Sequence, residues 1–183
     1  LDQMMKGFGV RACYTCSSSI YAQDVIRREP VDLIVIDCDM PELDGYDLIR
    51  WMRNSGLDNA YTPVIMVAGH TKASKVKKAR DCGANVIVAR PFSPSILLDR
   101  IVWIARDPRP FLEAADYAGP DRRFHDEGPP KNTGERRADR HSNGGADDAA
   151  AHQNAARGVT HVVRRGPAPS GAGALVEHPG HLH

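Results

Sequence analysis

The sequence predicts an α/β fold with an open, doubly wound parallel sheet. Three short apolar runs lack the polar alternation of a half-solvated strand, and their β-branched residues are typical of parallel strands buried on both faces. These runs cover residues 31–37, 63–68 and 86–89. Amphipathic stretches lie between them, so the chain alternates between strand and helix in the way that right-handed crossover connections require. In such sheets the functional groups lie at the carboxyl ends of the strands.

One weaker strand and four helices complete the predicted domain. The strand candidate covers residues 11–15. The helical stretches cover residues 17–28, 46–54, 73–82 and 94–106. A serine among residues 17–19 can cap the first helix, and Ser93 followed by Pro94 suits the start of the last one. Gly83 is a natural stop after the third helix.

The composition divides the 183 residues into a domain and a tail. From Asp107 onward, 77 residues contain 10 Gly and 8 Pro but only nine Ile, Leu, Val, Met, Phe or Trp. Such a segment cannot bury enough apolar surface to offset its chain entropy, and Pro108 disfavours a helical Asp107. We therefore predict one domain over residues 1–106 and a low-complexity, disordered tail over residues 107–183.

Charge and hydropathy argue against several function classes. Lys and Arg number 24 against 23 Asp and Glu, a formal net charge of +1, so the chain lacks the basic excess of a nucleic-acid-binding surface. The longest apolar runs have five residues, too few to span a bilayer. The first twenty residues show no secretory signal, and four Cys in such a chain favour a reducing compartment. We expect a cytoplasmic protein without nucleic-acid or membrane partners.

The cysteines and the C-terminal histidines leave one alternative open. Cys13 and Cys16 form a C-x-x-C pair, which could serve redox chemistry or supply half of a zinc site. His178, His181 and His183 could hold a transition metal. Redox or metal sensing therefore stands beside the functions considered next.

The most informative stretch runs from Asp37 to Gly45 and reads Asp-Cys-Asp-Met-Pro-Glu-Leu-Asp-Gly. It places a carboxylate at the tip of a buried strand, followed by a proline turn and a glycine. A carboxylate held there on a rigid scaffold can be a nucleophile toward phosphorus, a metal ligand, or both. It can also be a helix or loop cap, as strand-end acids often are.

This stretch resembles the phosphoacceptor segment of CheY-like response-regulator receiver domains, whose fold is flavodoxin-like. The resemblance covers about residues 1–106 in order and at consistent spacing. Further along, the segments that are similar to the surroundings of the family's fourth and fifth strands are residues 63–67, 83–84 and 90–92. Residues 117–123 are similar to tails of proteobacterial single-domain receivers.

The resemblance implies that Asp37 accepts a phosphoryl group from a histidine kinase or phosphotransfer protein and signals to an unknown output protein through protein contacts. Such a domain is a phosphoacceptor rather than an enzyme, apart from self-catalysed transfer to Asp37. A Mg²⁺ would be held by the Asp37 carboxylate and the backbone carbonyl of Asp39. Pro41, Gly45 and Pro91 would be turn residues.

Three departures from the family pattern make the predicted receiver partly degenerate. Ala68 stands where the family has a Thr or Ser that contacts the phosphoryl oxygens. Arg90 replaces the Lys, which keeps the charge but changes its geometry. Residues 1–8 resemble the end of the family's first helix, so we expect an N-terminally truncated domain without its first strand and without the acidic pair of the metal site.

A sheet of that kind would expose unpaired strand edges, so we expect marginal stability and weak or absent Mg²⁺ binding. The alternative to a phosphorylated receiver is a pseudo-receiver, a binding module that acts without phosphorylation.

Overall fold

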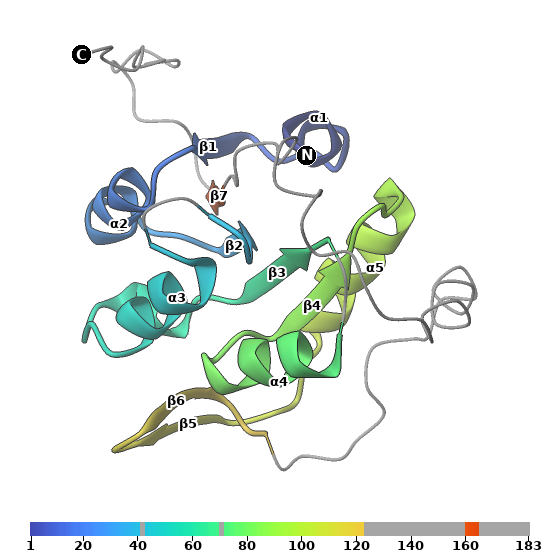
Figure 1. The fold of residues 1–183 in the computed structure, drawn as a ribbon. Helices are drawn as coiled ribbons and strands as arrows, with labels where there is room; N and C mark the ends of the chain where they lie inside the picture. The colour runs from blue at the N-terminus through green and yellow to red at the C-terminus, as the bar shows by residue number, and fades with distance from the viewer. Residues whose placement is uncertain (41–42, 70–71, 123–159, 165–183) are drawn as a thin grey trace, which may run out of the picture.

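The computed structural model describes residues 1–40, 43–69, 72–122 and 160–164. These residues form a five-stranded mixed sheet with helices on both faces, and a separate two-stranded hairpin (Figure 1). In chain order the elements are α1 (Asp2–Gly7), β1 (Ala12–Cys16), α2 (Ser19–Arg28), β2 (Leu33–Asp37), α3 (Gly45–Arg53), the short 3-10 helix η1 (Asp58–Tyr61), β3 (Val64–Ala68), α4 (Ala73–Asp81), β4 (Val86–Ala89), α5 (Pro94–Ala105), β5 (Phe111–Ala114), β6 (Tyr117–Pro120) and β7 (Thr160–Arg164).

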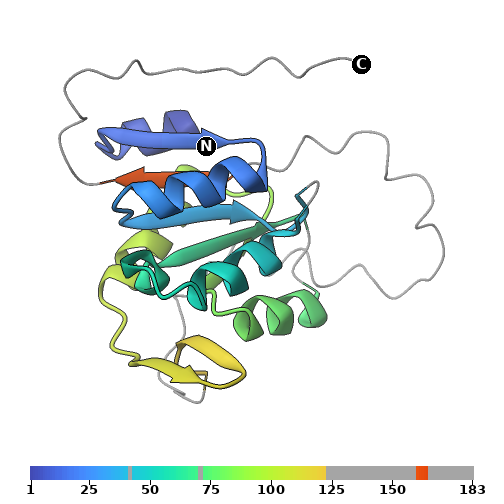
Figure 2. The same cartoon turned by 90° about the vertical axis from the view of Figure 1, so that its left-hand side faces the viewer.

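The strands of the main sheet follow the order β1-β7-β2-β3-β4. Strands β2, β3 and β4 are parallel to one another, whereas β7 runs antiparallel to both of its neighbours. Val162 at the middle of β7 lies opposite Tyr14 of β1 on one side and Ile34 of β2 on the other. Figure 2 shows β7 between β1 and β2, although it follows both by more than a hundred residues in the chain.

The predicted fold class, a purely parallel sheet that lacks its first strand and ends in a disordered tail, is wrong. Strand β7 comes from within the predicted tail and fills the place between β1 and β2 that we expected to be empty. Its five residues are too few, in too polar a context, to signal a strand by periodicity. The backbone N–H and C=O groups of β1 and β2 supply the pairing that makes it one, and these edges are hydrogen-bonded rather than exposed.

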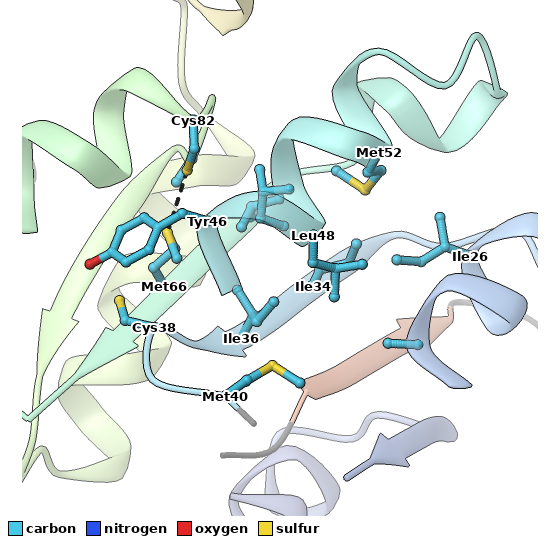
Figure 3. Close-up of a cluster of buried hydrophobic side chains, with 14 of the residues drawn as sticks. Ile26, Ile34, Ile36, Cys38, Met40, Tyr46, Leu48, Met52, Met66 and Cys82 are labelled. Atoms are coloured by element: carbon cyan, nitrogen blue, oxygen red, sulfur yellow. Dashed lines mark hydrogen bonds between the residues drawn. The ribbon is translucent and has the colours of Figure 1, made fainter. Parts of the chain in front are cut away.

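The sheet buries side chains on both faces. In β2 all five residues are buried, and alternate side chains join different clusters: Leu33 and Val35 pack toward α1 and α5, whereas Ile34 and Ile36 pack toward α2, α3 and α4. Figure 3 shows the cluster that contains Ile34 and Ile36, where Met66 lies among side chains of α3 and the end of α4. Burial on both sides is the reason for the continuous apolar runs in the sequence.

The helix signals in the sequence are confirmed. The hydroxyl of Ser18 accepts a hydrogen bond from the N–H of Ile20 at the start of α2, at 3.2 Å. Ser93 does the same for the N–H of Ile96 in α5, at 3.3 Å. Gly83 follows α4 with a φ of +92°, which a residue without a Cβ adopts at no steric cost. In the part of the chain that the structure describes, no helix is both long and apolar enough to cross a membrane.

Residues 107–122, which we assigned to the tail, fold against the domain as an ordered hairpin. Strands β5 and β6 pair antiparallel, and Tyr117 is buried. The guanidinium of Arg53, from α3, lies 5.3 Å from the ring centroid of Phe111 and donates to the carbonyl of Gly83 at 3.0 Å. The rest of the predicted tail, residues 123–159 and 165–183, lies outside the described residues.

Candidate functional site

The carboxylate of Asp37 lies at the carboxyl end of β2, and the residue is 6 % exposed. Its Oδ1 accepts a hydrogen bond from the backbone N–H of Asp39 at 3.1 Å, and its Oδ2 forms an ion pair with Nη2 of Arg90. Arg90 directly follows β4, and its backbone N–H donates to the carbonyl of Ala68 at 2.8 Å. The structure therefore brings the predicted acceptor and the predicted cation into direct contact.

A cavity of about 370 Å³ lies beside this ion pair. Among the described residues, three polar side chains line it, Asp37, Arg90 and His161, and the other described lining residues are apolar. Pro91 is part of that apolar lining, next to Phe92, and the Arg90–Pro91 peptide bond is cis. A mostly apolar cavity with a few convergent polar groups is the usual form of a small-ligand site.

Ala68 and Gly45 shape the surroundings of the acceptor in different ways. Ala68 is completely buried at the end of β3, and its methyl group has no hydrogen to donate to an anion. Gly45 begins α3 against the end of β2: a Cβ on this residue would lie 2.2 Å from the backbone oxygen of Asp37. Glycine is thus required for α3 to start where it does. Pro41 lies outside the described residues.

Two lysines of α4 form ion pairs with acidic residues of the loop that follows Asp37. Nζ of Lys75 lies 3.0 and 2.9 Å from the two carboxylate oxygens of Asp39, and Nζ of Lys78 lies 2.9 Å from Oδ2 of Asp44. Burial alone would raise the pKa of Asp44, but hydrogen bonds from Lys78 and from the backbone N–H of Asp47 outweigh it and lower that pKa. These contacts tie α4 to the loop that follows Asp37.

Comparison with known proteins identifies the domain. The sequence model of the response regulator receiver domain matches residues 1–102, more than half of the chain. The chain belongs to this family. The match begins at residue 1.

Relatives of this receiver support the assignment. The response regulator MprA of Mycobacterium leprae is 29% identical over 94 residues, which are 51% of this chain and 40% of that protein. The response regulator GtcR of Aneurinibacillus migulanus is 37% identical over 98 residues, 53% of this chain and 38% of GtcR. The receiver thus spans about two fifths of the length of these relatives.

A solved structure shows the same fold. The receiver domain of the sensor histidine kinase PA1611 from Pseudomonas aeruginosa PAO1 is 27% identical, with a TM-score of 0.51 over 57% of this chain and 84% of that one. It was solved with a magnesium ion coordinated in its active-site cleft.

The described residues of this receiver supply only part of such a magnesium site. Both carboxylate oxygens of Asp37 already have protein partners, and both oxygens of Asp39 contact Lys75. Within the described ranges, no three His, Cys, Asp or Glu side chains form a group that could hold a metal ion. Mg²⁺ requires near-octahedral oxygen coordination, so a preformed site would need oxygen donors beyond these two acids.

The cysteine pair of the receiver does not form a redox or zinc site. Cys13 and Cys16 point to opposite faces of β1, because residues three apart on a strand alternate, and they join different core clusters. Burial raises the pKa of Cys13 to about 11 and that of Cys16 to about 12, so both thiols stay protonated at neutral pH. The three C-terminal histidines lie outside the described residues.

Sequence reasoning missed two contributions to this site. His161 reaches the cavity only because β7 inserts into the sheet, and local sequence carries no signal for that pairing. Lys75 and Lys78 are spaced three apart on a helix, so a shared face was predictable. Their acidic partners lie more than thirty residues away, and only the fold brings the two together.

Proposed function

We propose that Asp37 accepts a phosphoryl group from the phosphohistidine of a histidine kinase or phosphotransfer protein. The carboxylate oxygen attacks the phosphorus, the P–N bond to the donor imidazole breaks, and that imidazole takes up a proton as it leaves. The product is an acyl phosphate on Asp37. The observation that carries this proposal is the nearly buried Asp37 carboxylate, paired with Arg90 at the wall of a cavity.

Arg90 supplies the positive charge in this step. The Arg90 side chain is 43 % exposed, so its guanidinium can move with the negative charge from the carboxylate to the phosphoryl oxygens without leaving the site. A guanidinium can bind two phosphoryl oxygens at once. The backbone N–H of Asp39 remains directed at the same carboxylate.

The acyl phosphate would carry the signal through α4. A phosphoryl group adds close to two negative charges, two residues away from the Asp39–Lys75 pair. The ammonium group of Lys75 can then pair either with the Asp39 carboxylate or with the new phosphoryl anion. The position of α4 therefore depends on phosphorylation. We propose that an output protein recognises this surface through direct contacts.

The test is labelling with a small phosphodonor. Wild type, Asp37→Asn and the control Asp39→Asn are incubated with acetyl phosphate, with and without Mg²⁺, and analysed by intact-mass spectrometry. We expect one added phosphoryl group in wild type and in Asp39→Asn, and none in Asp37→Asn. Equal labelling of wild type and Asp37→Asn would refute Asp37 as the acceptor.

A second candidate is a binding module that acts without phosphorylation. The buried Ala68 and the fully engaged carboxylates of Asp37 and Asp39 favour it. The labelling experiment, repeated with a phosphorylated histidine kinase as donor, separates the two. A folded wild-type protein that takes up no phosphoryl group from either donor supports the binding module.

A further inference from the structure

Strand β7 contributes a polar side chain to the wall of the acceptor cavity. Because β7 is antiparallel to β2, its first residues lie beside the last residues of β2, with Thr160 opposite Ile36 and His161 opposite Val35. Figure 2 shows this insertion, with β7 between β1 and β2. The start of β7 therefore lies at the edge of the sheet that carries Asp37.

Alternation along β7 decides which side chain faces the cavity. Thr160 and Val162 point toward α2 and α3: Val162 joins the cluster on that face, and the hydroxyl of Thr160 contacts Sδ of Met40 at 3.1 Å. His161 and Val163 point to the opposite face, as Val35 and Asp37 do. His161 is thus the polar residue that β7 places in the cavity.

The ring of His161 is held in one orientation. It is 6 % exposed, and its Nδ1 lies 3.3 Å from Oγ1 of Thr15 and 3.9 Å from Sγ of Cys13. Burial lowers the pKa of His161 to about 4, so the imidazole is neutral at pH 7. In the tautomer in which the Thr15 hydroxyl donates to Nδ1, the ring proton is on Nε2, and that atom is a hydrogen-bond donor.

We propose that His161 donates a hydrogen bond to the phosphoryl group on Asp37, so that the C-terminal strand completes the acceptor site. The inference rests on the proposed function. It also addresses a gap in the site: Ala68 has no hydroxyl to offer, and among the described residues Arg90 and His161 are the polar side chains, besides Asp37 itself, that line the cavity. The guanidinium of Arg90 attracts the dianionic phosphoryl group by its charge, and the neutral N–H donor of His161 adds a directional hydrogen bond.

The experiment compares two substitutions of His161 with a control on the same strand. His161→Leu fills the space without a donor, His161→Gln restores an N–H donor, and Val163→Ala weakens the packing of β7 while leaving the cavity lining unchanged. Each full-length protein is labelled with acetyl phosphate, the rate of labelling at Asp37 is measured, and its stability is measured by urea unfolding.

We expect His161→Leu to be labelled about tenfold more slowly than wild type, the rate equivalent of one lost hydrogen bond to a charged group. His161→Gln should recover most of the rate, and Val163→Ala should keep it despite a larger loss of stability. In wild type, the ¹⁵N signal of His161 Nε2 should shift on labelling, and it should not shift in Asp37→Asn.

Two results would overturn the role of His161 while leaving Asp37 as the acceptor. The first is that His161→Leu is labelled as fast as wild type. The second is that His161→Leu and Val163→Ala lose the same share of the labelling rate, which would mean that β7 acts only through stability. A wild-type protein that is never labelled at Asp37 overturns the proposed function and this inference together, and is recognised by the absence of label in every variant.

Discussion

Substitution of Val162 by Ala tests whether the C-terminal segment is a structural strand of the receiver. Val162 is completely buried, lies between Tyr14 and Ile34, and joins the cluster that packs against α2 and α3. Removing two methyl groups loses about 1.6 kcal/mol of burial at about 0.8 kcal/mol each, and the cavity left between two hydrogen-bonded neighbours raises the cost to about 2 to 3 kcal/mol. That is a large share of the stability of a small domain, about 5 to 15 kcal/mol.

The assay is urea unfolding followed by tryptophan fluorescence. Trp51 packs against the core cluster on one face of the sheet and Trp103 against the cluster on the other, so the two together report the whole domain. The control is Val102→Ala, because Val102 is 41 % exposed on α5 and its loss should change stability by less than about 0.5 kcal/mol. If Val162→Ala were as stable as the control, β7 would not be part of the sheet, and the inference about His161 would fail with it.

Three further predictions follow from single contacts. Gly45→Ala should lower stability by about 1 to 3 kcal/mol in the same unfolding assay, because its Cβ would meet a backbone oxygen at 2.2 Å that cannot move without shifting β2; a neutral effect would contradict the close approach. Arg53→Met should cost about 3 kcal/mol, since it leaves buried carbonyl groups beneath the hairpin without a donor, and unfolding that matches wild type would show that water replaces the guanidinium. Val163→Cys should form a disulfide with Cys13, directly opposite on β1, under mild oxidation, as shown by peptide mass mapping. Val162 points to the other face, so Val162→Cys should not form a disulfide with Cys13. A disulfide between Val162→Cys and Cys13 would mean that β1 and β7 pair in a different register.

Local patterns in the sequence predicted most of the domain. The continuous apolar runs gave β2, β3 and β4, and the caps at Ser18 and Ser93 begin helices as predicted. These signals succeed because burial on both faces and capping act over a few neighbouring residues. At the site, Asp37 and Arg90 were predictable for a related reason, since Asp37 is the last residue of such a strand and Arg90 directly follows another.

The predictions failed where pairing joins distant segments. The hairpin at residues 111–120 contains Tyr117 and Phe111, but its stability comes from contacts with α3, which composition cannot show. β7 was missed for the same reason: its Val162 and Val163 stand in a polar, glycine-rich region, and the energy that orders them comes from two partner strands.

Strand direction adds a chemical consequence to that missed pairing. At the carboxyl edge of a sheet, a parallel strand presents its last residues, and an antiparallel strand presents its first. Inserted in parallel, β7 would bring its Val163 end toward Asp37; inserted antiparallel, it brings Thr160 and His161. The polar character of the cavity wall therefore depends on the direction in which five residues pair, and neither the composition of the segment nor its hydrophobic pattern encodes that direction. In this receiver the sheet order decides which distant side chain lies next to the acceptor.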